Sequence, residues 1–153
     1  MYQRILVPVD GSSTSTRALT AALQMARLSG ARIRLVHVVG DMAYASGYDL
    51  YGGQSGELVK IMREAGTKVL ADAMAVAQSA GVETDSLLFD QFGDRLAETV
   101  ADLAKDWKAD LIVVGTHGRR GVGRMFLGSG AEQIIRLAPT PVLVIRDQAA
   151  AEN

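Results

Sequence analysis

The chain of 153 residues contains no cysteine. Disulfide frameworks, thiolate metal sites and cysteine nucleophiles are therefore excluded, and cysteine usage leaves the redox compartment open. The chain also lacks a charge excess, because 16 Lys and Arg residues against 17 Asp and Glu residues give a net charge of −1. No global attraction to nucleic acid or to an anionic membrane follows, so any charged ligand must be held locally.

Long apolar runs are absent as well. The longest extend over about five residues before a charge interrupts them, so no insertion into a membrane is expected. Residues 1–4 lead directly into a strand-like run, without the apolar length or cleavage site of a secretion signal. We therefore expect a cytoplasmic protein.

A chain of this length builds one core, which hides about 70% of the unfolded surface, and has no room for a second catalytic domain. We expect one domain over residues 1–147 and a flexible tail over 148–153.

Apolar runs and segments of helical periodicity alternate along the chain. Continuous apolar runs are typical of strands that are covered on both faces, as in a parallel sheet. The predicted strands are 5–9, 33–39, 82–89, 111–114 and 142–145. Four helices are predicted: one after candidate caps at 12–14, one over 57–80, one starting at 93–94 and one starting near 129. This order predicts an α/β, Rossmann-like fold: a largely parallel open sheet with helices on both faces.

Three segments have distinct expected positions. Acidic residues in 82–90 indicate an exposed strand near a sheet edge, whereas the strongly apolar 111–114 indicates a central strand. The strand 142–145 would be an unpaired edge in a monomer, and such edges invite pairing. We therefore predict a homodimer through this last strand.

The long loop predicted over 41–56 is rich in glycine and tyrosine. Loops of this length are uncommon in compact domains and usually have a function. It would cap a ligand, contact a partner or pack in a higher oligomer, and the sequence does not decide among these roles.

A ligand of an open parallel sheet lies beyond the carboxyl ends of the strands, where the winding reverses. The segment 115–130 follows a strand and contains six glycines, three arginines, one histidine and no acid. Glycine N–H groups, a helix starting near Ser129 and arginine side chains together favour a phosphate site. The alternative is a flexible basic loop that needs turns. Neither a P-loop nor a G-x-G-x-x-G motif is present.

The pattern Gly115-x2-Gly118-x9-Gly128-Ser129, placed between a strand and a helix, resembles the ATP-binding signature of the universal stress protein family. The segments 5–12, 35–39 and 138–145 add to the resemblance, which covers residues 2–146. It implies five parallel strands in the order 3-2-1-4-5, an adenine nucleotide held across strands one and four, and dimers or tetramers.

The resemblance also assigns roles to matching residues. Pro8, Val9 and Asp10 would line the adenine and ribose, and the Val38 backbone would recognise the adenine edge. Asp10 would also approach a phosphate-bound Mg²⁺ or Mn²⁺ through water. The residues expected to meet the ribose and phosphates of ATP, ADP or AMP are Gly115, Thr116, His117, Gly118, Arg119, Arg120, Gly121, Gly128, Ser129, Gly130 and Ala131.

Ala131 departs from the family pattern, because many ATP-binding members carry a second hydroxyl at this position. The missing hydroxyl weakens one phosphate contact, whereas the N–H groups of Gly130 and Ala131 still donate. We expect binding to survive with reduced affinity for the terminal phosphate.

Several of these residues have a simpler alternative role. His117 is favoured as a ligand contact over an acid or base, because no carboxylate near it in the sequence would orient it. Asp10 could be only a turn or cap residue. Arg120 and Arg124 could face solvent or a neighbouring subunit. His37, within an apolar strand, is interpreted as a packed and hydrogen-bonded histidine.

The resulting hypothesis is a nucleotide-binding regulatory protein of the stress response, not an enzyme. Its nucleotide state would control oligomerisation or a partner protein such as a membrane transporter. Paired carboxylates, an activated nucleophile and a P-loop lysine are not seen, so any hydrolysis should be slow. The alternatives are a slow ATPase or nucleotidyl-transfer enzyme, although Ser-Gly-Gly-x-Asp and His-x-Gly-His signatures are absent, and an oligomeric adaptor with a vestigial site.

Overall fold

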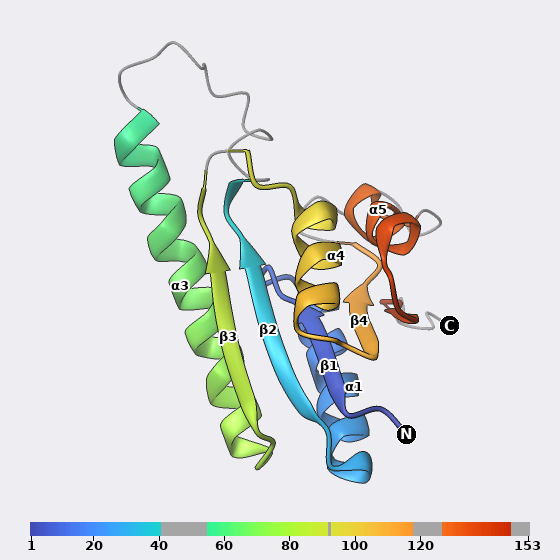
Figure 1. The fold of residues 1–153 in the computed structure, drawn as a ribbon. Helices are drawn as coiled ribbons and strands as arrows, with labels where there is room; N and C mark the ends of the chain where they lie inside the picture. Colours follow the sequence, from blue (N-terminus) through green and yellow to red (C-terminus); the bar gives the residue numbers. More distant parts are fainter. Residues whose placement is uncertain (41–54, 92, 118–126, 148–153) are drawn as a thin grey trace, which may run out of the picture.

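The computed structural model describes residues 1–40, 55–91, 93–117 and 127–147 (Figure 1). Its strands form one parallel sheet in the order β3-β2-β1-β4-β5. They are β1 (Arg4–Pro8), β2 (Arg32–Val38), β3 (Thr84–Phe89), β4 (Leu111–Gly115) and β5 (Val142–Ile145). The helices in the described ranges are α1 (Ser13–Ser29), α3 (Ser55–Ser79), α4 (Leu96–Asp106) and α5 (Ser129–Leu137). The predicted fold class and strand order are confirmed.

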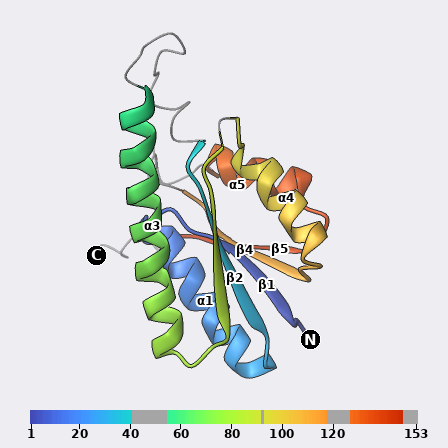
Figure 2. The same cartoon turned by 60° about the vertical axis from the view of Figure 1, so that its left-hand side comes forward.

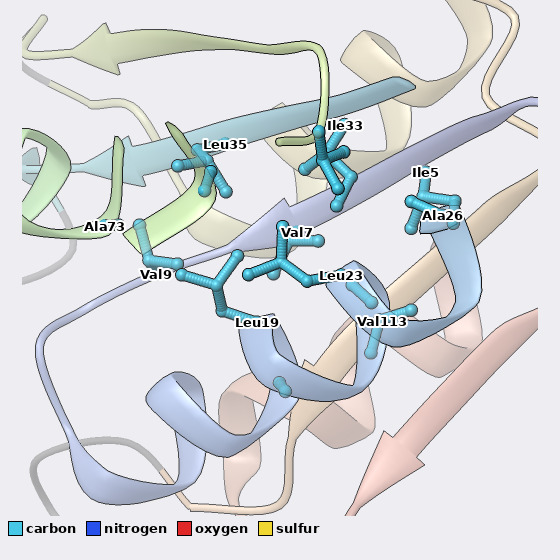
Figure 3. Close-up of a cluster of buried hydrophobic side chains, with 14 of the residues drawn as sticks. Ile5, Val7, Val9, Leu19, Leu23, Ala26, Ile33, Leu35, Ala73 and Val113 are labelled. Carbon is cyan, nitrogen blue, oxygen red and sulfur yellow. The ribbon is translucent and has the colours of Figure 1, made fainter. Parts of the chain in front are cut away.

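Helices cover both faces of the sheet, as Figure 2 shows. One apolar cluster lies against α1 and α3, and Figure 3 shows its side chains from β1, β2 and β4 pointing toward α1. A second cluster lies against α4 and α5 and includes Leu6, Val36 and Ile112. Burial of a side chain of this size stabilises the fold by about 1.5–3 kcal/mol, so the two clusters fix the sheet between its helix layers. None of the helices within the described ranges has the length and apolar character needed to cross a membrane.

The strand positions agree with the predicted exposure pattern. The predicted edge position of β3 is confirmed. Its Asp85 stands opposite Arg34 of β2 and accepts two hydrogen bonds of 2.7 Å from that guanidinium group. These bonds raise the pKa of Arg34, and burial of the group opposes the rise. The strand β4 is interior, as predicted, but the middle strand of the sheet is β1.

Hydrogen bonds show which of the predicted caps the first helix uses. The Ser12 side chain accepts from the N–H of Ser15 at 3.2 Å, so Ser12 is the N-cap among the three candidates. Gly30 ends the helix with a φ of 72°, a left-handed conformation that glycine adopts at little cost.

Some predicted boundaries were wrong by a few residues. The helix α4 starts at Leu96, not at residues 93–94, because Gly93 has a φ of 94° and the Asp94 carboxylate accepts the N–H of Gln91 in a turn. The helix α3 starts at Ser55, inside the loop predicted over 41–56. The rest of that loop, 41–54, and the predicted tail, 148–153, lie outside the described residues.

Candidate functional site

The carboxyl ends of β1 and β4 form the point at which the winding of the sheet reverses. The two strands pair over only two positions, Ile5 with Leu111 and Leu6 with Ile112, whereas β1 pairs with β2 up to Pro8. The connections after β1 and β4 lead to α1 and toward α5, on opposite faces of the sheet (Figure 2). This is the place at which open parallel sheets bind ligands.

Asp10 forms the turn between β1 and α1. Its Oδ1 accepts the N–H of Ser12 at 2.9 Å, and its own N–H donates to the Ser15 hydroxyl at 3.3 Å. The simpler role, a turn residue, is therefore present. The second carboxylate oxygen bonds to none of the described residues, which leaves it available for a ligand.

Thr14 joins the two halves of the site and was missed by sequence reasoning. It lies in the first turn of α1, is 3% exposed, and donates its hydroxyl to the carbonyl oxygen of His117, just after β4. A Cβ on Gly115 would lie 2.8 Å from the Thr14 carbonyl carbon and oxygen. Glycine at 115 therefore lets α1 approach β4. The sequence presented Thr14 only as one of three candidate caps of the first helix.

The His117 side chain has one satisfied and one unsatisfied ring nitrogen. Its Nδ1 lies 3.0 Å from the Thr116 hydroxyl oxygen. Its Nε2 is buried and has no hydrogen-bond partner among the described residues. Buried polar atoms are nearly always hydrogen-bonded, so a group beyond the described residues, such as water or a ligand, can bond to this atom. Gly118, Arg119, Arg120, Gly121 and Arg124, which were predicted from the same segment, lie outside the described residues.

The start of α5 is held against the end of β4. The N–H of Gly128 donates to the Thr116 carbonyl oxygen at 2.7 Å, and a Cβ on Gly128 would lie only 2.6 Å from that oxygen. Gly128 is the N-cap and supplies no side-chain hydrogen bond.

The first backbone bond of α5 is donated by Glu132 to the Gly128 carbonyl at 2.9 Å. The N–H groups of Ser129, Gly130 and Ala131 precede it and have no partner among the described residues. Free N–H groups and the positive end of the helix dipole together accept anions.

Ala131, the departure from the family pattern, has a second role. Its side chain is 6% exposed and belongs to the apolar cluster under α4 and α5. The methyl group therefore contributes to the core, and the residue's N–H is the group left for a ligand.

The adenine side of the predicted site lies at the ends of β1 and β2. Val9 and Val38 are 4% and 5% exposed, and the N–H of Val9 donates to the Val36 carbonyl at 2.9 Å. His37 is 3% exposed and its Nδ1 lies 2.7 Å from the Val9 carbonyl oxygen, so its interpretation as a packed, hydrogen-bonded histidine is confirmed. No group of three or more His, Asp or Glu side chains placed to bind a metal occurs within the described ranges.

The fold and these contacts define a doubly wound α/β protein in which N–H groups at the start of α5, beside the switch point, have no partner among the described residues. A family model described as the universal stress protein family matches residues 1–146. The chain therefore belongs to the universal stress protein family.

Known relatives agree with this assignment. A universal stress protein of Thermus aquaticus is 37% identical over 146 residues, which are 95% of this chain and 100% of that protein. A crystal structure of a universal stress protein family member from Burkholderia pseudomallei is 37% identical, with a TM-score of 0.75, and covers 94% of this chain and 96% of its own.

Two related structures contain adenine nucleotides. The universal stress protein of Archaeoglobus fulgidus in complex with dAMP is 26% identical, with a TM-score of 0.67, over 94% of this chain and 98% of its own. A universal stress protein in complex with cAMP is 25% identical, with a TM-score of 0.62, over 95% of this chain and 97% of its own.

Proposed function

We propose that this protein binds an adenine nucleotide (ATP, ADP or AMP) and acts as a regulatory protein rather than as an enzyme. The observation that carries the proposal is the set of polar groups around the switch point that have no partner among the described residues: the first N–H groups of α5 and the buried Nε2 of His117. Related structures contain dAMP and cAMP, which supports an adenine nucleotide as the ligand.

The phosphates would lie at the start of α5. The N–H groups of Ser129, Gly130 and Ala131 fit phosphate oxygens, and the His117 Nε2 would donate or accept at the same end. Gly115, Thr116 and Gly128 shape this end of the site. Gly118, Arg119, Arg120 and Gly121 belong to the proposal through the sequence motif.

The adenine and ribose would lie over Pro8, Val9 and Asp10, with the Val38 backbone at the adenine edge. The second carboxylate oxygen of Asp10, which has no partner among the described residues, is suited to a ribose hydroxyl or to a phosphate-bound Mg²⁺ or Mn²⁺ through water. A metal ion held here would screen the phosphate charge. Its remaining ligands would be phosphate oxygens and water, because the described residues offer no cluster of carboxylates.

A regulatory role is favoured by how the site is connected. Thr116 accepts the N–H of Gly128 through its carbonyl, and its own N–H donates to the Ile145 carbonyl of β5 at 2.9 Å. Thr116 thus links the start of α5, where the phosphate would bind, to β5, the edge strand that we propose as the dimer contact. His117 Nδ1 bonds to a hydroxyl, not to a carboxylate that would make it a strong base, which favours contact over catalysis.

We further infer that residues 1–147 act as one nucleotide-binding unit in the cytoplasm during stress. The bound nucleotide would alter homodimer or tetramer assembly, or the control of a partner such as a membrane transporter.

Calorimetry of the purified protein, stripped of retained ligand, tests the binding proposal. We expect saturable binding of AMP and ATP at or below millimolar ligand, and ATP turnover much slower than that of dedicated ATPases. AMP should bind almost as well as ATP, because Ala131 lacks the hydroxyl of the family pattern. No binding of either nucleotide at millimolar concentration would contradict the proposal, and rapid turnover would favour an enzyme over a regulatory protein.

A proline at Val144 tests the dimer. In the β4–β5 ladder, the N–H groups of Ile112 and Thr116 donate to the carbonyls of Pro141 and Ile145, so the backbone of Val144 points away from β4. Val144→Pro removes an outward N–H and leaves that ladder intact. Light scattering at micromolar concentration should show a dimer for the wild type and a larger monomer fraction for the variant. The control Val144→Thr should remain dimeric, and a monomeric wild type would contradict the prediction.

A further inference from the structure

We propose that His37 is a positioning residue for the adenine subsite: by holding the Val9 carbonyl, it leaves the N–H of Val38 free to donate to the base. The inference rests on the proposed function, since it assigns a role within the same site. It concerns a residue that touches the protein backbone rather than the ligand.

The first step is the register of the β1–β2 ladder. The N–H of Arg32 donates to the Gln3 carbonyl at 3.0 Å, and the N–H of Val9 donates to the Val36 carbonyl at 2.9 Å. Pro8 and Val36 are the last Cα partners of the ladder. In this register, the next bond would run from the Val38 N–H to the Val9 carbonyl. It would repeat the bond from Arg32 to Gln3, because Val38 and Val9 each lie six residues further along their strands.

That next bond is not formed, and the Val9 carbonyl bonds to a side chain instead. His37 Nδ1 lies 2.7 Å from the Val9 oxygen. The N–H of Val38 donates to no group among the described residues, although Val38 is only 5% exposed. Buried N–H groups without a partner are rare in proteins, so this one indicates a missing acceptor.

The bond also fixes the tautomer of His37. A carbonyl oxygen can only accept, so Nδ1 must carry the proton. The imidazole is held in place from its other side by α3: a Cβ on Gly66 would lie 2.6 Å from the ring Cδ2 and 3.0 Å from Nε2. Gly66, in the middle of a 25-residue helix, thus makes room for the ring.

The consequence for the ligand is a preference in hydrogen bonding. A lone backbone N–H at the end of β2 needs an acceptor, and the edge of adenine offers the N1 atom. Guanine carries a proton on N1, so its N1–H would face the Val38 N–H, and two donors would meet without an acceptor. The hydrogen bond from His37 therefore favours adenine over guanine without contact between its side chain and the base.

The free protein tests the hydrogen-bond arrangement without any nucleotide. Nitrogen-15 NMR should show the proton of neutral His37 on Nδ1, the less common tautomer in water. Hydrogen exchange at the Val38 amide should be faster than at Val36, and it should slow in His37→Leu, where Val9 and Val38 can complete the ladder. A proton on Nε2 alone would overturn the inference, whatever the protein binds.

Matched variants then test the use of this arrangement in binding. His37→Leu removes the donor, whereas His37→Asn places an amide N–H near the position of Nδ1. We expect AMP affinity to fall about fivefold in His37→Leu and about twofold or less in His37→Asn, the range of one net hydrogen bond. Gly66→Ala should weaken AMP binding as well, because its methyl group displaces the ring.

A nucleotide without the N1 acceptor completes the comparison. In the wild type, 1-deaza-AMP should bind about fivefold more weakly than AMP, and in His37→Leu the two should bind alike. Equal affinity of the wild type for both nucleotides would overturn the inference. Failure of the wild type to bind any nucleotide would contradict the proposed function instead, and the NMR result would still decide whether His37 holds the Val9 carbonyl.

Discussion

Replacing Gly128 with alanine should lower nucleotide affinity at least about tenfold and the free energy of unfolding by about 1–3 kcal/mol. The added Cβ would lie 2.6 Å from the Thr116 carbonyl oxygen, a backbone atom that cannot rotate away. The conformation of Gly128, φ −60° and ψ 148°, is ordinary for alanine, so the effect would come from this collision alone. The start of α5 must then move away from β4, and its free N–H groups move with it. Calorimetry and thermal unfolding measure both effects.

Gly130→Ala is the matched control, two residues further along the same turn. Among the described residues outside its own helical turn, one atom lies within 4 Å of its added Cβ: Leu96 Cδ2 at 3.2 Å, the end of a side chain that can adjust. Alanine also favours the helix by up to about 1 kcal/mol relative to glycine. We expect unchanged or slightly higher stability and retained binding. Equal losses in the two variants would show that any side chain in this turn blocks the ligand and that the Thr116 contact is not the cause.

Replacing Thr14 with valine should cost about 1–3 kcal/mol of unfolding free energy and weaken nucleotide binding severalfold. Valine keeps the shape of threonine, but the carbonyl of His117 loses its donor in a site where Thr14 is only 3% exposed. The connection after β4 would no longer be tied to α1, so the adenine and phosphate halves of the site would lose their fixed separation. Urea unfolding and AMP titration provide the two measurements.

The control for this change lies in the same helix. Thr20 is exposed and its hydroxyl donates to the Thr16 carbonyl, four residues earlier. Thr20→Val should change stability by less than about 0.5 kcal/mol and leave binding unchanged. A Thr14→Val protein with the stability and affinity of this control would show that the Thr14–His117 bond does not hold the site together.

Sequence reasoning located the elements because each carried a local signal. Apolar runs predicted the five strands, and Ser12 and Gly30 lay where caps were expected. Boundaries were less accurate where a turn decided them. The start of α4 moved to Leu96 because Gly93 adopts a left-handed conformation, which composition does not reveal.

The part of the site that was predicted also carried a local sequence signal. A glycine-rich motif after a strand is a local pattern, and it led to Gly115, Gly128 and Ser129. Thr14 was missed because its partner, His117, is 103 residues away. Sequence reasoning assigned no role to Gly66, because nothing near it in the sequence indicates the imidazole that lies against it.

By itself, the sequence determined the α/β class, the alternation of elements and the family motif, since these depend on hydrophobic periodicity and on residues close along the chain. Its resemblance to the family also supplied the strand order. Only the tertiary structure decided which backbone groups are left unpaired. The Val38 N–H has no partner among the described residues while the Val9 carbonyl bonds to His37, and the N–H groups at the start of α5 are held at the end of β4 by Thr116. Such pairings arise where strands and helices distant in sequence meet, and those contacts exist only in the folded chain.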